Sequence, residues 1–372
     1  MRGASARGRP IDEDKTLNLL RILGWSAARR AQLEALDDPR LRPARVGAVE
    51  RNQCLALDDG EPRWATLSGR LTEATDAMQR PTVGDWVAVD GERVVQVFPR
   101  TTYFARKGAG RSSAPQLVCA NIDVVFAVTT CGRDLNPRRV ERYVAAIYGG
   151  GARPVVVLNK ADEADDPWSQ VAAIERVAPG VPVIATSALR PDALGPLAPW
   201  LAVGTTVALL GSSGVGKSTL VNRLLGVEAQ GTAEVREDDE RGRHTTTRRS
   251  LAVAPCGVAV VDTPGMRELG LWRADDGLDA VFADIGELAS ACRFRDCRHE
   301  DEPGCAVRAA VESGALDPDR LTSQQQLERE LAYAARRDDA RAARASERVW
   351  RDRSRQMRVR RKLEGRLGLR DE

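Results

Sequence analysis

The chain has 372 residues, of which 42% are hydrophobic and 29% are charged, with a formal net charge of +3. Such a composition is typical of a soluble protein, and the length is sufficient for two or three domains. There is no apolar run of about 18 residues, which argues against a membrane-spanning helix. The first residues, MRGASARGRPIDEDK, lack the apolar middle of a signal peptide, so we expect a cytoplasmic protein.

Residues 1–40 form an N-terminal extension that is polar except for a short helical pattern, WSAARRAQLEAL. Over residues 41–110 five short alternating runs, such as DWVAVDG and RVVQVFP, are separated by turn signals. Five short strands in this space predict a small β-barrel, of which the OB type is one candidate. The basic segment ARKGAGRSS at the end of this region predicts a linker or a contact loop.

Over residues 111–275 apolar runs alternate with helical segments, from IDVVFAVTT through RPVVVLN and PVIATSA to TTVALLG and VAVVD. Continuous apolar strands that alternate with helices predict a parallel sheet covered by helices on both faces. Residues 276–335 are helical around a cysteine cluster, and residues 336–372 predict a basic helical tail. This tail carries 14 Lys and Arg against 7 Asp and Glu. It suggests contact with a polyanion such as RNA, although a solvated Arg-rich helix explains the charge as well.

The stretch from Gly211 to Ser218, GSSGVGKS, fits the phosphate-loop pattern G-x-x-x-x-G-K-[ST] and lies between an apolar strand and a helix. Glycines allow backbone N–H groups to surround phosphates at the start of a helix. In such a loop Lys217 reaches the β- and γ-phosphates and the hydroxyl of Ser218 binds Mg²⁺.

A second motif, NKAD from Asn159 to Asp162, comes before the phosphate loop. The carboxylate of Asp162 can accept two hydrogen bonds from guanine, whereas adenine presents the wrong pattern. The next strand ends in TSA, residues 186–188, where a backbone N–H can meet the guanine O6. NKAD alone can also be an ordinary strand-end turn. Two such motifs at the ends of successive parallel strands favour a base-binding site, because ligands bind at that edge of the sheet.

Two further segments fit a nucleotide switch. DTPG ends an apolar strand, so Asp262 is expected near the metal ion and Gly265 near the γ-phosphate. Before it, the segment RHTTTRR offers three threonine hydroxyls that can reach Mg²⁺ only while a γ-phosphate is present. The sequence does not choose among these threonines, and we take the middle one, Thr246, as the candidate ligand.

Three cysteines and one histidine have the spacing C-x4-C-x-H-x5-C, at Cys292, Cys297, His299 and Cys305. Three thiolates and one imidazole make a closed tetrahedral set for one structural zinc ion. Clustered cysteines in a cytoplasmic chain favour a metal over a disulfide. The alternative is three reduced thiols beside a surface histidine.

Together, GSSGVGKST, GRHTTT, DTPGMREL, CRFRDCRHEDEPGC and the position of NKAD before the phosphate loop resemble the family of ribosome small subunit-dependent GTPase A. Members of this family are circularly permuted GTPases. The resemblance covers roughly residues 41–335. It implies an α/β P-loop GTPase domain with an N-terminal OB-type β-barrel and a C-terminal helical zinc-binding domain.

The resemblance also implies an activity, which is hydrolysis of GTP to GDP and phosphate during late maturation of the small ribosomal subunit, stimulated by that subunit. GTP as substrate, Mg²⁺ and one structural zinc ion would be bound. The partner would be the small subunit with its 16S rRNA, and we expect a monomer without DNA or membrane contact. The implied nucleotide-contacting residues are Asn159, Lys160, Asp162, Ser187, Ala188, Gly211, Ser212, Ser213, Gly214, Val215, Gly216, Lys217, Ser218, Thr219, Asp262 and Gly265.

For catalysis, Met266 occupies the position after D-x-x-G where many GTPases place a water-orienting glutamine. We therefore expect slow intrinsic hydrolysis that a partner accelerates. His244, beside the switch threonines, is the candidate water-positioning group, with Lys217 and Thr246 as the other catalytic candidates. A role for His244 in RNA contact or a solvent-exposed position is the alternative.

Two rival functions are a P-loop kinase or ATPase and a non-catalytic RNA-binding scaffold. NKAD and TSA argue against the first, and intact Lys217, Ser218 and Asp262 argue against the second. The permuted order also places the zinc domain directly after DTPG. We therefore expect movement of that switch to reposition the zinc domain.

Overall fold

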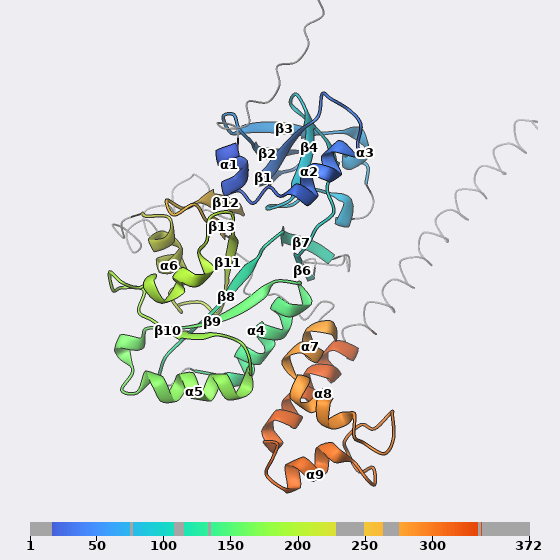
Figure 1. Cartoon of the computed structure of the whole chain (residues 1–372), viewed down its shortest axis with the longest axis vertical. Coiled ribbons are helices and arrows are strands. Elements are labelled where there is room, and N and C mark those ends of the chain that lie inside the picture. Colours follow the sequence, from blue (N-terminus) through green and yellow to red (C-terminus); the bar gives the residue numbers. More distant parts are fainter. Residues whose placement is uncertain are drawn as a thin grey trace, which may run out of the picture.

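The structure, a computed structural model, describes residues 17–74, 77–107, 115–132, 135–227, 249–262, 275–333 and 336. Within these ranges the chain forms a small β-barrel, then a six-stranded α/β domain, then a group of helices. Figure 1 shows the barrel at one end, the helices at the other and the sheet between them. This order of a barrel, an α/β domain and a helical region is the one that the sequence predicted.

The barrel is closed by five strands in the order β1-β2-β3-β5-β4. Its pairs are antiparallel except β3 with β5, which are parallel. Alternate residues such as Cys54 and Ala56 are buried inside it, as the alternating sequence pattern predicts. The barrel elements are β1 (Arg42–Glu50), β2 (Gln53–Leu57), β3 (Arg63–Leu67), α3 (Gly69–Thr72), η1 (Ala77–Gln79), β4 (Trp86–Asp90) and β5 (Arg93–Val97).

A two-stranded antiparallel sheet connects the barrel to the α/β domain. It consists of β6 (Tyr103–Lys107) and β7 (Pro115–Ala120). The sequence predicted a linker or contact loop over ARKGAGRSS, but its first residues, 105–107, belong to β6. The reason is that their backbone groups pair with β7, a non-local partner that local composition does not reveal.

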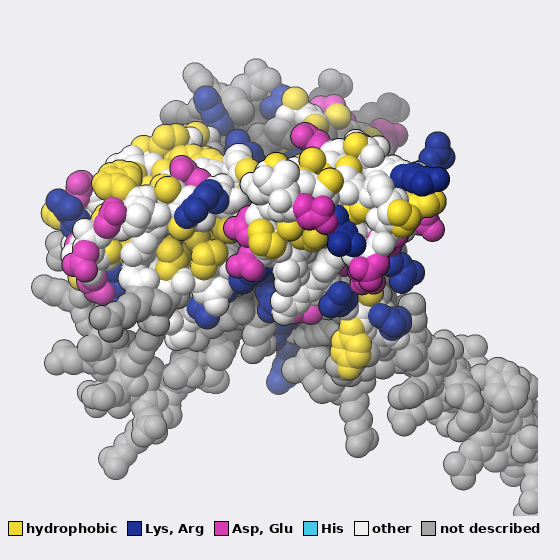
Figure 2. All heavy atoms as spheres, turned by 90° about the horizontal axis from the view of Figure 1, so that it is seen from below, with side chains coloured by type: hydrophobic (Ala, Val, Ile, Leu, Met, Phe, Trp, Pro, Cys, Tyr) yellow, Lys and Arg dark blue, Asp and Glu magenta, His cyan; other side chains and the backbone are white. Residues whose placement is uncertain are grey.

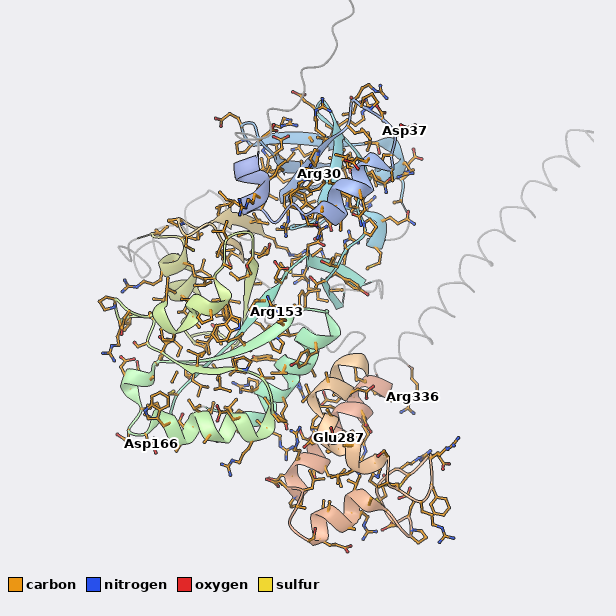
Figure 3. All side chains as sticks on the ribbon, in the orientation of Figure 1. Arg30, Asp37, Arg153, Asp166, Glu287 and Arg336 are labelled. Atoms are coloured by element: carbon orange, nitrogen blue, oxygen red, sulfur yellow. The ribbon has the colours of Figure 1, made fainter. Side chains whose placement is uncertain are left out.

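The α/β domain contains one sheet in the order β10-β9-β8-β11-β13-β12. Its strands are parallel except β12, which runs antiparallel to β13. Its elements are β8 (Val124–Thr130), α4 (Pro137–Gly149), β9 (Arg153–Asn159), η2 (Ala161–Glu163), α5 (Pro167–Val177), β10 (Val183–Ala185), η3 (Gly195–Trp200), β11 (Thr206–Leu210), α6 (Lys217–Leu224), β12 (Ser250–Val253) and β13 (Ala259–Asp262). Asp166, labelled in Figure 3, caps the start of α5 by accepting from the backbone N–H groups of Trp168 and Ser169.

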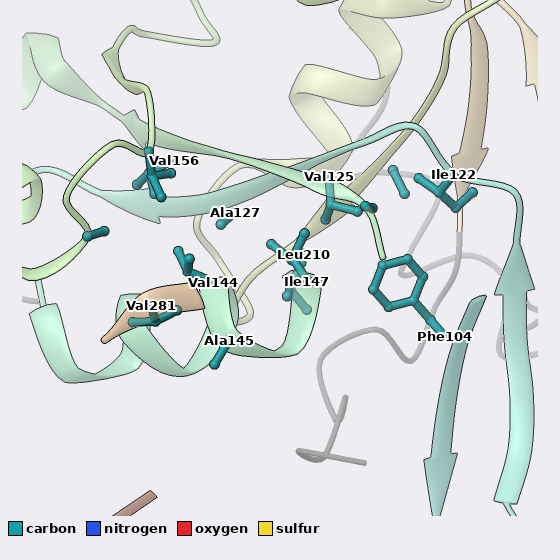
Figure 4. Close-up of a cluster of buried hydrophobic side chains, with 14 of the residues drawn as sticks. Phe104, Ile122, Val125, Ala127, Val144, Ala145, Ile147, Val156, Leu210 and Val281 are labelled. Carbon is teal, nitrogen blue, oxygen red and sulfur yellow. The ribbon is translucent and has the colours of Figure 1, made fainter. Parts of the chain in front are cut away.

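Both faces of this sheet are buried. Along β8, Val125 and Ala127 join one hydrophobic cluster, whereas Val124, Phe126 and Val128 join another. Figure 4 shows the first cluster, in which α4 packs against the sheet. This explains the continuous apolar strands of the sequence, because each side of the strand has a layer to cover it.

The C-terminal helices are α7 (Asp275–Val281), α8 (Ala283–Ala289), α9 (Ala306–Glu312) and a further helix over residues 318–333. They pack on α4 of the α/β domain. A Cβ on Gly277 would lie 2.2 Å from the carbonyl oxygen of Ala145, so only glycine permits this approach of α7 to α4. Arg320 is buried and donates to Asp284, to Glu141 on α4 and to the carbonyl of Val281.

The N-terminal segment, which contains α1 (Leu17–Ile22) and α2 (Ala27–Glu34), contacts both the barrel and the residues before β8. The Trp25 ring centroid lies 4.9 Å from that of Trp86 in the barrel. The guanidinium of Arg45 in β1 donates to the carbonyl of Leu23 and, at 2.8 Å, to that of Asn121, just before β8. No role for this extension was predicted from the sequence, because such contacts are non-local. No helix among the described ranges is both long and apolar enough to cross a lipid bilayer.

Candidate nucleotide and zinc sites

The predicted phosphate loop joins a strand to a helix, since β11 ends at Leu210 and α6 begins at Lys217. Gly216 has a φ of 94°, and a Cβ there would lie 2.1 Å from Nδ2 of Asn159. Glycine is therefore required for both conformation and space. The Nζ of Lys217 donates to the carbonyl of Ser212. Ser218 is exposed at the start of α6, as a magnesium-binding hydroxyl must be.

Asn159 connects the phosphate loop to the predicted base-reading loops. Its side chain is buried at the end of β9. Its Nδ2 donates to the carbonyl of Val215 at 2.7 Å, and its Oδ1 accepts from the backbone N–H of Ala188 at 2.8 Å. Three motifs that are far apart in the sequence therefore meet at one side chain, at the carboxyl ends of β9, β10 and β11.

Asp162 and Ser187 lie together at the base-reading end of this site. A hydrogen bond from the Ser187 hydroxyl lowers the pKa of Asp162, so the carboxylate is ionised at neutral pH. An exposed carboxylate is the acceptor that guanine requires. Lys160, between Asn159 and Asp162, has a left-handed φ of 60°, which turns the chain away from β9. The N–H of Ala188 already donates to Asn159, so contact with the guanine O6 would require it to serve two acceptors.

A pocket of about 980 Å³ lies on one flank of the phosphate loop. Its lining includes residues 212–215 of the loop, Lys160, and Gly132 after β8. Asp162 and Ser187 do not line it, so it lies beside the base-reading groups and not over them.

The switch candidates are only partly described. β13 ends at Asp262, where desolvation raises the pKa of the carboxyl and the ammonium of Lys217 opposes that rise. A carboxylate close to the phosphate-loop lysine is suitably placed for a metal-binding role. His244, Thr246 and Gly265 lie outside the described residues, and so does Met266.

The predicted zinc ligands lie together in the C-terminal helices. Their ligand atoms are all within 4.8 Å of one another. Nδ1 of His299 lies 3.3 Å from Sγ of Cys305 and 3.7 Å from Sγ of Cys292, and the two sulfurs are 3.9 Å apart. A tetrahedral zinc ion with Zn–S bonds of about 2.3 Å separates its sulfurs by about 3.8 Å. The donor set and its spacing therefore fit one zinc ion, with Cys297 as the fourth ligand.

The thiolate form that zinc requires is favoured at one of these cysteines. Desolvation acts to raise the pKa of Cys292, but hydrogen bonds from the backbone N–H groups of Val307 and Ala306 and from the thiols of Cys305 and Cys297 together outweigh it, and the pKa is lowered. These N–H groups belong to the first turn of α9, whose unpaired donors favour negative charge.

Comparison with known proteins agrees with this geometry. The model of the RsgA GTPase family matches residues 97–272. The small ribosomal subunit biogenesis GTPase RsgA of Opitutus terrae is 44% identical over 93% of this chain and 99% of its own length. The protein of the same name from Methanosarcina acetivorans is 43% identical over 85% of this chain and 86% of its own.

The chain belongs to the RsgA GTPase family. It is therefore a GTP-hydrolysing enzyme. Among solved structures, YjeQ from Thermotoga maritima has a TM-score of 0.60 at 25% identity, over 78% of this chain and 99% of that one. YloQ, described as a circularly permuted GTPase, has a TM-score of 0.56 at 23% identity, over 80% of this chain and 96% of that one, and supports the fold. The prediction of a permuted GTPase is confirmed.

A second family model, that of ABC transporters, matches residues 199–349. This range contains the phosphate loop, which many nucleotide-binding families share. The relatives that match nearly the whole chain are RsgA GTPases, so the shared loop accounts for the match.

The sequence did not predict that α4 contacts the phosphate loop of this RsgA family member. Nη1 of Arg139 and the hydroxyl of Tyr143 each lie 3.2 Å from Oγ of Ser212. Arg139 and Tyr143 are separated by four residues, so they share one face of the helix. The available signal was the position of α4 directly after β8, which neighbours β11 in the sheet.

Proposed function

We propose that this chain binds the small ribosomal subunit, including its 16S rRNA, and hydrolyses GTP to GDP and phosphate during late subunit maturation, with hydrolysis stimulated by the subunit. GTP binding and hydrolysis are supported by the two hydrogen bonds of the Asn159 side chain, which connect the phosphate loop to the base-reading loops. The ribosomal part is supported by the name of the relatives, small ribosomal subunit biogenesis GTPase. The protein acts as a cytoplasmic monomer, without DNA or membrane contact.

The nucleotide is bound by the residues that the sequence motifs supply. The backbone of residues 211–219 and the ammonium of Lys217 hold the phosphates. Ser218 and Thr246 bind Mg²⁺, with Asp262 and Gly265 near the ion and the γ-phosphate. Asn159, Lys160 and Asp162, with Ser187 and Ala188, form the guanine end. One structural zinc ion held by Cys292, Cys297, His299 and Cys305 stabilises the C-terminal helices.

The catalytic proposal concerns His244. Met266 cannot orient a water molecule, and His244 is adjacent to the switch threonines, so His244 takes that role when the subunit is bound. His244→Ala should abolish subunit-stimulated hydrolysis while GTP binding survives. Retained stimulation would remove His244 from the mechanism.

The domain division that accompanies this function is an N-terminal extension (1–40), the barrel (41–110), the GTPase domain (111–275), the zinc domain (276–335) and the basic tail (336–372). The boundary at residue 110 falls in the connection between β6 and β7. On the face seen in Figure 2, basic and acidic side chains of the described residues are interspersed. RNA contact is proposed for the basic tail, which carries 14 Lys and Arg against 7 Asp and Glu.

GTP turnover with and without purified small subunits, repeated over a range of salt concentrations, tests the proposal. The subunit should accelerate turnover, and added salt should weaken that acceleration steeply, because contacts to phosphate backbones release counterions. The same turnover with and without subunits would refute the ribosomal role. A competition between GTP and ATP separates the GTPase from an ATPase, since only the former excludes ATP.

A further inference from the structure

Ser212, the second residue of the phosphate loop, is held by α4. Its Oγ accepts a hydrogen bond from Nη1 of Arg139 at 3.2 Å and forms a second with the hydroxyl of Tyr143 at 3.2 Å. A serine hydroxyl has one donor and two acceptor positions, so both contacts can be made at once. Arg139 also lines the pocket beside the loop. The guanidinium of Arg139 donates to Ser212, and among the described residues no carboxylate forms an ion pair with it.

The opposite face of α4 is fixed to the C-terminal helices. Glu141 lies two residues after Arg139, hence about 200° around the helix. Its carboxylate is fully buried and accepts hydrogen bonds from Ser323 and Arg320. Close packing of Gly277 against the backbone of α4 adds to this attachment. The helix that carries Arg139 and Tyr143 is therefore a rigid support and not a loosely packed surface element.

Lys217 contacts the backbone of the same residue. Its ammonium donates to the carbonyl of Ser212. An ammonium has three donors, so Lys217 can keep this contact while it reaches the β- and γ-phosphates of a bound nucleotide. At the other end of the loop Asn159 holds Val215. At the Ser212 end, Arg139 and Tyr143 hold the side chain and Lys217 holds the backbone.

We propose that Arg139 and Tyr143 are positioning residues of the phosphate loop, which hold the side chain of Ser212 and so keep the loop in its nucleotide-binding conformation. A loop held in its bound conformation loses less conformational freedom on binding, which strengthens binding. The effect is on GDP and GTP alike, because the anchored residue is in the loop and not at the γ-phosphate. This inference rests on the nucleotide site proposed above.

The test is nucleotide binding by three variants: Arg139→Ala, Tyr143→Phe and Ser212→Ala. Affinities for GDP and for a non-hydrolysable GTP analogue are measured with the full-length protein. Each variant should bind both nucleotides about fivefold more weakly, which corresponds to about 1 kcal/mol. For Arg139→Ala and Tyr143→Phe the kcat at saturating GTP should stay within about twofold, since uniform binding affects KM. Arg142→Ala is the control, because Arg142 is an exposed arginine of the same helix that pairs with Glu330.

A double variant decides whether Arg139 acts through Ser212. Arg139→Ala combined with Ser212→Ala should bind GDP no more weakly than the weaker single variant. Additive losses of affinity in the double variant would overturn the proposal. It would also be overturned if Arg139→Ala weakened only GTP binding and did so in the Ser212→Ala background too, because the guanidinium would then act on the γ-phosphate. An affinity equal to that of Arg142→Ala would also overturn it. Lys217→Ala tests the nucleotide site itself, and retained nucleotide binding by this variant would refute the site. If Lys217→Ala loses binding but Arg139→Ala binds nucleotide with unchanged affinity, only the positioning role is refuted.

Discussion

Nδ2 of Asn159 lies 2.7 Å from the carbonyl oxygen of Val215, so the predicted base motif and the phosphate loop share a buried hydrogen bond. In the chain the base motif comes first, yet in the sheet β9 and β11 lie on either side of β8. Circular permutation changes the order of the strands in the chain without changing their neighbours in the sheet. The contact is therefore available whichever end of the domain comes first.

Replacing Asn159 with alanine should weaken GDP and GTP binding together. The change leaves the carbonyl of Val215 and the N–H of Ala188 without their partner, and an unsatisfied buried group costs about 1–3 kcal/mol. We expect at least about a tenfold loss of affinity for both nucleotides. Titration with a fluorescent GDP analogue measures it, and Asn52→Ala, an exposed asparagine of the barrel, is the control. Unchanged affinity would contradict the bridging role.

Asp162→Asn should shift base preference from guanine to xanthine nucleotides. The carboxylate of Asp162 accepts hydrogen bonds from two N–H groups of guanine. The amide of asparagine has one acceptor oxygen and one donor NH₂ group, and that donor matches xanthine, which has an oxygen where guanine has an amino group. Competition between GTP and xanthosine triphosphate for the purified variant measures the preference. If the variant still prefers GTP as strongly as the unsubstituted chain, NKAD does not read the base.

Much of this site could be predicted from the sequence, because its motifs are local. The phosphate loop, NKAD and the cysteine spacing each need one short segment, and their strand and helix contexts follow from periodicity. What the sequence did not predict depends on partners far away in the chain. Arg139 contacts Ser212 across 73 residues, and Arg45 contacts Asn121 across 76.

One expectation about movement changes with the structure. The sequence places the zinc domain directly after the switch, which suggested that the switch repositions it. In the structure α7, the first helix after that segment among the described residues, is packed on α4 through Gly277. Repositioning would therefore have to separate α7 from α4. The coupling stays a hypothesis, and unchanged hydrogen exchange over residues 265–310 between GTP and GDP would contradict it.

Removing zinc should unfold the region around α9 and leave the sheet domain folded. The binding energy of a structural zinc ion, about 10 kcal/mol or more, is folding energy for its domain. We expect one zinc ion per chain by metal analysis, and loss of amide protection across residues 292–312 on chelation. Cys297→Ser should lose the metal, whereas Cys256→Ser, an exposed thiol outside the cluster, should keep it. Full protection after complete metal removal would contradict a structural role.

Arg320→Ala should destabilise the chain more at pH 8 than at pH 5. Desolvation raises the pKa of Glu141, and the Ser323 hydroxyl, Arg138 and Arg320 oppose that rise. A carboxyl whose pKa is higher in the folded state than in the unfolded state stabilises the fold at a pH below its unfolded-state pKa. This stabilisation is lost as the pH rises through the folded-state pKa. Without Arg320 the folded-state pKa rises further, so the loss grows. At pH 8 we expect a cost of about 3–5 kcal/mol, as for other broken buried pairs.

Denaturant unfolding at both pH values measures this difference. Arg142→Ala, which breaks the exposed pair with Glu330, should cost no more than about 0.5 kcal/mol at either pH. Adding Glu141→Gln to Arg320→Ala should recover part of the stability and remove most of the pH dependence, because the buried charge is gone. Asp284, the other carboxylate beside Arg320, is more exposed, so water can solvate it once the guanidinium is removed. An equal loss at pH 5 and pH 8 would show that Arg320 acts through packing against Phe282 and not through the charge of Glu141.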